Sequence, residues 1–285
     1  MRFRVKVFES CYWIPGYDFE GEIISRVSRY ARSCDYLVIS EKAVATALGY
    51  LVDESKLEPG LPARILARVW IPVFWGYILG VLCSLKPTTL IKLRVYPYID
   101  GARHKEAAIR FVGPIAALKH FSEGGLDVNN LPYSYASIPL PRCRAYEVAS
   151  KIRGKLVDRY GLDLTVVIVD SDHTFSWRSI HISSRQSVDG IINLSTLGFI
   201  IGASLRWKAR PTPIAISGSY SSLEEVLEVC RVADRAMGYG LGRDIWDASS
   251  RFDIQLTGLT WDILMMHPHK PYALVRRIDK LLDSR

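Results

Sequence analysis

The first half of the chain switches between strand-like and helix-like patterns of apolar residues. Strict alternation of apolar and polar residues predicts a strand over 2–9, and a continuous apolar run predicts a buried strand over 35–40. Apolar residues at helical spacing lie between and after these strands. They predict helices over 19–33, 41–51 and 61–85, and a further strand is predicted over 88–98.

The second half continues this mixture. A helical pattern over 104–121 is interrupted at Gly113-Pro114 and leads into the polar loop 122–132. The other predicted elements are helices over 143–159 and 222–238, a helix or loop over 191–204, and strands over 164–170, 180–184, 213–218 and 272–277. Because strands and helices mix without regular β-α-β alternation, the pattern predicts an α+β fold with a mixed sheet.

One apolar segment raises the question of a membrane. Val69 to Leu85 contains 17 residues without a charge, which is the lower limit for a membrane span. Pro72, Gly76 and Gly80 interrupt it, and the mean hydropathy of the chain is only +0.09. We therefore expect a helix covered by the rest of the fold or by a second subunit, and membrane contact is the less favoured alternative.

Charge and cysteine usage narrow the class of protein. The net charge of +8 suits an anionic partner, although a solvated basic surface explains it equally well. Five cysteines without a C-x-x-C pair indicate reduced thiols, and no secretory apolar run follows the start, so a cytoplasmic protein is expected.

Only five Asn and Gln residues occur in the chain, and a low content of these thermolabile residues is a trend of thermophile proteins. No P-loop, G-x-G-x-x-G or dedicated nucleic-acid module is present.

Two carboxylate positions could carry chemistry. Asp127 follows two glycines in the segment GGLDVNN, where carboxylate and amide oxygens are ligands of the kind that Mg²⁺ or Mn²⁺ prefers. Asp170, with Ser171 and Asp172, ends the predicted buried strand, a position that often holds a metal beside nucleotide phosphates. Ordinary turns explain either position as well.

The order of motifs resembles a known family. G-x-x-H-K-E-A-A-I-R-F-V-G-P, then SEGGLDVNNLP, a helix ending ASKIRGKLVDRYGLD, and VVIVDSDHTFSWR are similar in sequence and order to coenzyme F-420:gamma-glutamyl ligases. The resemblance implies a gamma-glutamyl-ligase-like core over 1–220, with 221–285 as a C-terminal α/β extension. It also implies transfer of glutamate to a deazaflavin coenzyme with GTP and a divalent cation, in a homodimer whose sites lie near the subunit interface.

The resemblance also assigns site residues. Asp127, Asp170 and Ser171 fall on the positions of metal ligands for Mg²⁺ or Mn²⁺. The nucleotide, GTP or ATP, would be contacted by residues of the early loop and of the later motifs, namely Trp13, Pro15, Gly16, Lys42, Asn130 and Arg178.

Two departures from the family pattern leave the reaction open. Thr46 stands where the family has a lysine, and Lys42 lies one helical turn earlier. The bulky basic segment ASLRWKAR (203–210) replaces a glycine-rich acidic loop. The resemblance still implies a metal- and nucleotide-dependent amide-forming ligase, with an unidentified acceptor. The alternative is a non-catalytic binding or regulatory homologue that binds an anionic small molecule.

Overall fold

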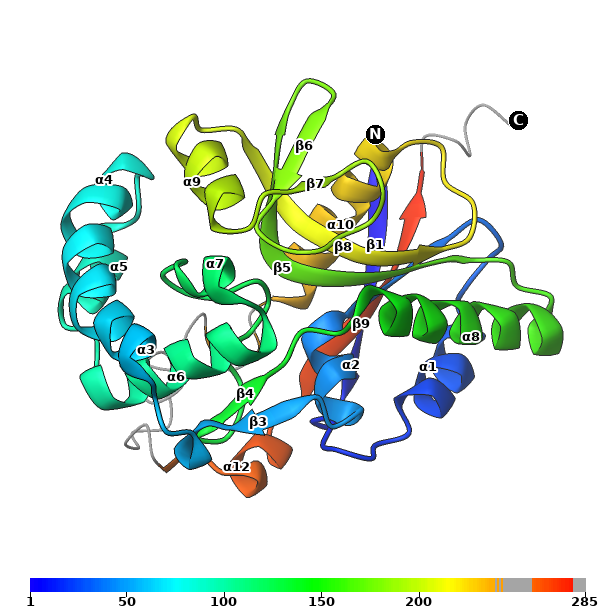
Figure 1. Cartoon of the computed structure of the whole chain (residues 1–285). Coiled ribbons are helices and arrows are strands. Elements are labelled where there is room, and N and C mark those ends of the chain that lie inside the picture. The colour runs from blue at the N-terminus through cyan, green and yellow to red at the C-terminus, as the bar shows by residue number, and fades with distance from the viewer. Residues whose placement is uncertain (239, 241, 243–257, 279–285) are drawn as a thin grey trace.

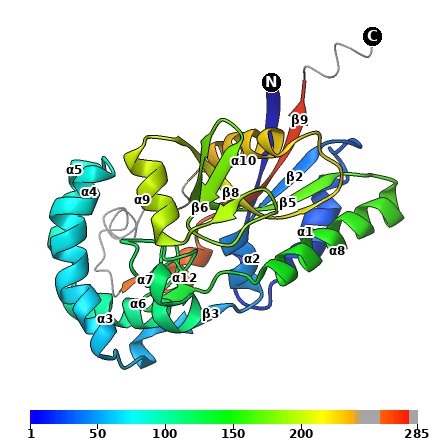
Figure 2. The same cartoon turned by 45° about the horizontal axis from the view of Figure 1, so that its top comes forward.

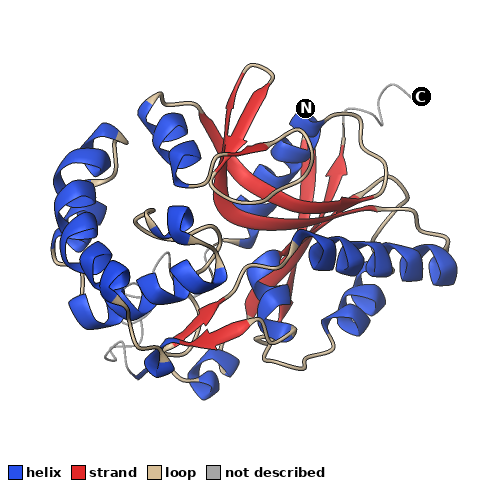
Figure 3. Ribbon diagram, in the orientation of Figure 1, coloured by secondary structure: helices blue, strands red, loops and turns tan. Residues whose placement is uncertain are grey.

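A mixed sheet forms the centre of the molecule (Figure 3). The computed structural model describes residues 1–238, 240, 242 and 258–278. In this part of the chain the main sheet has seven strands in the order β1-β9-β2-β5-β6-β7, and β8 also pairs with β5. The strands are β1 Phe3–Ser10, β2 Tyr36–Ser40, β5 Thr165–Trp177, β6 Ile180–Ser183, β7 Ile192–Asn193, β8 Lys208–Ser217 and β9 His269–Arg277. Parallel β2–β5 pairing beside antiparallel β5–β8 pairing confirms the α+β prediction.

Helices cover both faces of the sheet because its central strands are apolar on both sides (Figure 2). Helices α1 (Phe19–Val27) and α8 (Arg142–Tyr160) pack on the face that carries Leu37 of β2. Helix α10 (Leu223–Met237) packs on the opposite face, against Val38. Successive β2 residues therefore enter two different cores, as the two-residue period of a strand requires.

A helical lobe stands beside the sheet, at the left of Figure 1. It contains α3 (Leu61–Ile65), the π-helical η2 (Leu66–Leu79), α4 (Gly80–Leu82), α5 (Pro87–Arg94), α6 (Tyr98–Phe111) and α7 (Pro114–Ala117), and α9 (Thr196–Ser204) lies near it. Helix α2 (Glu41–Ala47), the short helix η1 (Glu54–Lys56), helix α12 (Trp261–Met265) and a two-stranded sheet of β3 (Leu51–Asp53) and β4 (Tyr135–Ser137) complete the described elements.

The strand predicted over 88–98 is wrong, because this segment holds α5 and the start of α6. Its β-branched residues favoured a strand, but Pro87 occupies the first turn of α5, where a proline is well tolerated. Leu93 is completely buried against the neighbouring helix, and the Arg94 Nε–H donates to the Gly76 carbonyl at 2.9 Å. Tertiary packing thus outweighs the local preference.

The helix predicted over 61–85, which contains most of the apolar segment, is observed as one continuous helix from Leu61 to Leu82. By its length and composition this helix could cross a membrane. In its most apolar stretch of 18 residues, 28% are buried inside the fold. Ile71 and Trp75 are fully buried, and the indole N–H of Trp75 donates to the Leu118 carbonyl at 2.7 Å. A Cβ at Gly80 would lie 2.6 Å from Leu90, so α5 of the same chain makes the close approach that this glycine permits.

The C-terminal part contributes to the same sheet as the rest of the chain. Strand β9 pairs with β1 on one side and with β2 on the other, so it lies inside the sheet. Helix α10 places Val226 and Cys230 in the core on one face. The described residues after 220 therefore share the sheet and core of residues 1–220.

Candidate functional site

A cavity of about 960 Å³ is lined by residues of the sheet, the helical lobe and the loops between them. The start of α2, the loop around Asp127, the middle of β5 and helices α5 and α6 all contribute to its walls. Six of the nine residues predicted from the sequence line it, namely Trp13, Lys42, Asp127, Asn130, Asp170 and Ser171. The fold therefore brings the two predicted carboxylates to one cavity, although they lie far apart in the chain.

Asp127 is held by a short antiparallel bridge. Its backbone N–H donates to the Ser137 carbonyl at 3.2 Å, and the Ser137 N–H donates back at 2.8 Å. Its Oδ1 accepts the Asn129 N–H at 2.8 Å, and its Oδ2 accepts from the Lys42 ammonium. The carboxylate is thus fixed by the loop on one side and paired with a cation on the other.

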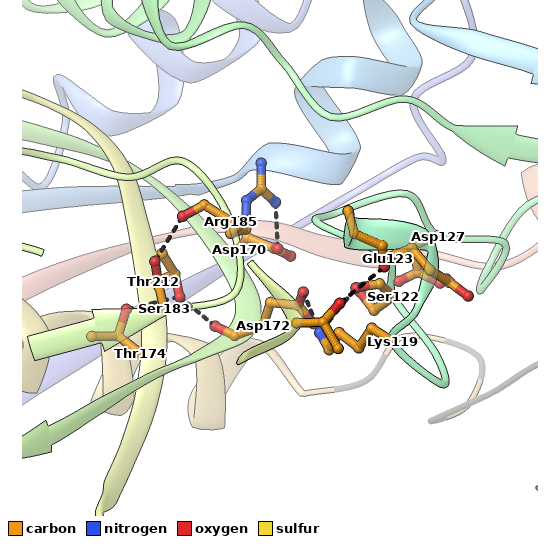
Figure 4. A network of polar contacts seen from close by, with 12 residues as sticks. Lys119, Ser122, Glu123, Asp127, Asp170, Asp172, Thr174, Ser183, Arg185 and Thr212 are labelled. Atoms are coloured by element: carbon orange, nitrogen blue, oxygen red, sulfur yellow. Dashed lines mark hydrogen bonds and ion pairs between the residues drawn. The ribbon is translucent and has the colours of Figure 1, made fainter. Parts of the chain in front are cut away.

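Asp170 follows the buried run of β5 and lines the cavity. Figure 4 shows it beside Arg185. The guanidinium of Arg185 donates to its Oδ2 and makes two further hydrogen bonds of 2.7 Å to the carboxylate of Glu41. Burial alone would raise the pKa of Asp170, but the attraction of Arg185 and nearby cations outweighs it, so the pKa lies below its ordinary value. Asp170 is therefore an ionised carboxylate in a buried ion-pair network.

Arg185 also contacts the loop that carries Asp127. Gly125 has a φ of +99°, and a Cβ at this position would lie 2.6 Å from the Arg185 Cζ. Only glycine satisfies both the left-handed backbone and this close approach. Gly125 therefore allows the loop that carries Asp127 to pass over the Arg185 guanidinium, which in turn holds Asp170.

A second ion pair lies next to Asp170. The Lys119 ammonium is 2.8 Å from Asp172 and donates to the Ser122 carbonyl at 2.9 Å, which joins β5 to the loop (Figure 4). The Ser171 hydroxyl donates to Asp234 of α10 at 2.7 Å. Between Asp170 and His173 the pairing of β5 with β8 is irregular, and this irregularity lies where the chain presents Ser171 and Asp172.

A buried cluster supports the start of the loop. His104 lies between two glutamates, with Nδ1 2.6 Å from Glu54 and Nε2 2.9 Å from Glu123, while Lys105 also pairs with Glu123. Burial opposes the charge on the imidazole, but the two carboxylates outweigh it and raise the pKa of His104 to about 10. Glu123 directly precedes Gly124 and Gly125, so the cluster anchors the loop that leads to Asp127.

The early loop contributes less to the cavity than the resemblance implies. Trp13 is buried, and its indole N–H donates to the Ser10 hydroxyl at 2.9 Å. Pro15 and Gly16 are exposed and do not line the cavity, and the Gly16 N–H donates to the Ala47 carbonyl at 2.8 Å. The loop therefore packs against the end of α2, and it contributes Tyr12 and Trp13 to the cavity wall, with the Tyr12 hydroxyl donating to the Asn130 carbonyl.

Arg178 is not brought together with the other predicted residues. It occupies the turn between β5 and β6, and its guanidinium lies 5.0 Å from the centre of the Trp177 ring. The basic segment 203–210 has a structural explanation as well. The buried Arg210 pairs with Glu224 at 2.6 Å and with Glu228 at 3.1 Å, so it joins β8 to α10.

Several residues of the site were not singled out from the sequence. His104 and Lys105 lie within the H-K-E segment of the resemblance, which was a usable signal. Glu41 and Arg185 gave none, because they are 144 positions apart and their pairing arises only in the fold. Thr46, which replaces a family lysine, lines the cavity, and its hydroxyl donates to the Lys42 carbonyl at 2.8 Å.

Comparison with known proteins identifies the family of the chain. Residues 12–198 match the family model of F420-0:Gamma-glutamyl ligase. A protein of Methanocaldococcus jannaschii described as uncharacterized is 32% identical over 253 residues, which cover 85% of this chain and 84% of that protein. The matched range contains the Asp127 loop, Asp170 and Arg185. The chain therefore belongs to the F420-0:gamma-glutamyl ligase family.

Proposed function

We propose that this protein is an amide-forming ligase that uses a nucleoside triphosphate and a divalent cation. The observation that carries the proposal is the convergence of Asp127 and Asp170 on one cavity, through the network that starts at Glu41 and Lys42. The family membership supports the reaction class. GTP is the nucleotide that the resemblance implies, and ATP is the alternative.

The donor set fits a cation that is bound together with phosphate. Within the described residues, no three side chains of His, Cys, Asp or Glu form a cluster that could hold a metal by themselves. Mg²⁺ is often held by one or two carboxylates while substrate phosphates and water complete its shell, and Mn²⁺ takes similar oxygen ligands. Asp127 and Asp170, with the Ser171 hydroxyl, would hold such a cation. Its chemistry would be to neutralise charge on the transferring phosphoryl group.

The protein groups around the cavity match the charges of such a reaction. A carboxylate of the acceptor would attack the γ-phosphorus, the nucleoside diphosphate would leave, and the amine of glutamate would then displace phosphate from the acyl phosphate. Lys42 and Lys119 line the cavity and supply positive charge to phosphate oxygens. Asn130 lines the same cavity and would be an amide contact for the nucleotide.

The helical side of the cavity suits the acceptor. The rings of Tyr96, Phe121 and Phe199 line the cavity, and the Phe199 ring of α9 lies 5.7 Å from the Phe175 ring of β5. Aromatic walls bind planar ring systems by stacking and by excluding water. A ring-bearing acid such as the deazaflavin coenzyme of the family fits this lining.

Calorimetry with Mn²⁺ and GTP tests the proposal. Asp127→Asn and Asp170→Asn should each weaken binding of the Mn²⁺–GTP pair by about tenfold or more, because each removes a charged oxygen ligand. Arg178→Ala is the matched control, since this residue lies outside the cavity, and it should leave the isotherm unchanged. Release of nucleoside diphosphate with a panel of acids and glutamate then tests the chemistry. Identical isotherms for the wild type and both aspartate variants would refute the metal site.

A non-catalytic function has one observation in its favour. Asp127, Asp170 and Asp172 are each already paired with a cation of the protein, Lys42, Arg185 and Lys119 respectively. Such a neutralised site could bind an anionic small molecule without a metal. Binding of GTP with equal affinity in the presence of Mn²⁺ or of EDTA, without release of diphosphate, would favour this alternative.

The assembly belongs to the same proposal. Much of the helix from Leu61 to Leu82 is exposed, and large apolar side chains such as Val73, Ile78 and Val81 face outward. Contiguous apolar surface of this kind is typical of contact sites. A cytoplasmic homodimer that covers this face agrees with the family resemblance. Light scattering and fractionation without detergent distinguish a dimer from a membrane-bound protein.

A further inference from the structure

Lys42 occupies the open side of the Asp127 carboxylate. Asp127 Oδ1 is taken by the Asn129 N–H, and Oδ2 is taken by the Lys42 ammonium, which also lies 3.4 Å from the Asn129 carbonyl. Both side chains line the cavity. The ammonium therefore lies on the carboxylate oxygen that a cation in the cavity would use.

The two cations of the network differ in how firmly they are held. Arg185 is almost completely buried and is fixed by both oxygens of Glu41 as well as by Asp170. The Lys42 side chain is 24% exposed, and the contacts that the structure gives its ammonium are with Asp127 and, at 3.4 Å, with the Asn129 carbonyl. A lysine ammonium on a flexible four-carbon stem changes partner easily, whereas a guanidinium bound by several carboxylate oxygens does not. Lys42 is thus the cation that can leave.

We propose that Lys42 and a divalent cation compete for Asp127, and that the cation, arriving with the nucleotide, releases the Lys42 ammonium to the phosphates. This inference rests on the proposed function. A divalent cation and an ammonium that both contact Oδ2 repel each other at short distance, so binding of one disfavours binding of the other. The exchange keeps positive charge beside Asp127 at every stage, so the carboxylate is never left uncompensated.

Competition predicts that removing the Lys42 ammonium strengthens one kind of binding and weakens another. By linkage, removing the ammonium must tighten the binding of the metal alone, because the metal no longer has to displace it. The same change must weaken the binding of the metal–nucleotide pair, because the phosphates lose their cationic partner. A lysine that only stabilised the loop would weaken both kinds of binding when it was removed.

The test measures Mn²⁺ binding to the full chain without nucleotide, from the electron paramagnetic resonance signal of free Mn²⁺. Lys42→Met should bind Mn²⁺ at least about fivefold more tightly than the wild type, the lower end of typical coupling between sites. Lys86→Met is the matched control, because it removes the same charge from the same cavity without a contact to Asp127. Adding Asp127→Asn to Lys42→Met should abolish the gain. With GTP present, Lys42→Met should bind the Mn²⁺–GTP pair more weakly.

The outcomes separate this inference from the proposed function. Equal Mn²⁺ affinity in the wild type and Lys42→Met, with Mn²⁺ bound by both, would overturn the competition while leaving the metal site intact. An equal gain in Lys86→Met would also overturn it, because the effect would then be one of net charge. Absence of Mn²⁺ binding in all variants, with or without GTP, would refute the metal site and the competition together.

Discussion

Glu41 and Lys42 are neighbours at the start of α2, yet they pair with opposite charges on two different segments. Glu41 binds Arg185, which in turn holds Asp170, while Lys42 binds Asp127. One turn of helix therefore fixes the relative positions of both candidate ligand carboxylates. Because α2 directly follows the central strand β2, this junction is anchored in the main sheet.

Replacing Arg185 should destabilise the fold strongly. Arg185→Met leaves the carboxylates of Glu41 and Asp170 buried without their partner, and breaking a buried ion pair in this way costs about 3–5 kcal/mol. Urea unfolding of the full chain measures the loss. The double variant Glu41→Gln/Arg185→Met should lose less than Arg185→Met alone, because it removes one of the two stranded charges. A larger loss in the double variant would contradict this account.

Deprotonation of His104 should lower the stability of the folded chain as the pH becomes alkaline. Its pKa is raised from 6.5 to about 10 in the folded chain, so the folded state binds a proton that the unfolded state releases. The resulting stabilisation is complete below about pH 6.5 and is lost as the pH rises through 10. Between these values the free energy of unfolding should fall by up to about 1.4 kcal/mol per pH unit.

Denaturant unfolding from pH 6 to 10 checks this dependence. His104→Gln, which keeps a polar side chain but cannot titrate, is the control. The difference in unfolding free energy between the wild type and His104→Gln should shrink as the pH rises. A difference that stays constant over this range would show that the imidazole does not carry the extra proton.

Two helical glycines should respond in opposite ways to alanine. A Cβ at Gly198 of α9 would lie 2.8 Å from the carbonyl carbon of Ser183, a backbone atom that cannot move aside, so Gly198→Ala should cost about 1–3 kcal/mol. Gly154 of α8 has no neighbouring atom within 4 Å of the added Cβ. Gly154→Ala should therefore stabilise the chain by up to about 1 kcal/mol. Thermal unfolding of both variants provides the comparison, and two shifts of the same sign would refute it.

What could be predicted from the sequence was the local chemistry. The apolar run that ends at Asp170 and the glycines before Asp127 are short patterns whose meaning depends on a few neighbouring residues. The partners of these carboxylates could not be found in this way. Arg185 follows β6 in an ordinary polar segment, and only the sheet brings it to Glu41.

The same limit explains why a strand was predicted where α5 forms. Thr88, Thr89 and Ile91 favour strands because they are β-branched, although Pro97 within the predicted range argues against a strand. The helix forms because Leu93 and Arg94 pack against the π-helical segment η2, whose position depends on the whole lobe. Elements held mainly by neighbours far along the chain are thus the ones that local patterns miss.

The exposed face of the long apolar helix should form the contact between the two subunits of a dimer. Ile78 and Val81 are each more than half exposed, so Val81→Glu hardly alters the interior of the subunit. In a dimer that covers this face, the new carboxylate would be buried without a partner, which is costly. Light scattering should therefore give a dimer for the wild type and a mass near 32.2 kDa for Val81→Glu.

Tyr146→Glu is the matched control for this experiment. It places the same charge at a similarly exposed apolar position on α8, a helix outside the helical lobe, and it should leave the dimer intact. Loss of the dimer in Tyr146→Glu as well would indicate a general effect of charge rather than contact through the apolar helix. A wild-type mass of 32.2 kDa at micromolar concentration without detergent would contradict the dimer itself. Recovery in the membrane fraction would instead favour a lipid surface as the partner of this face.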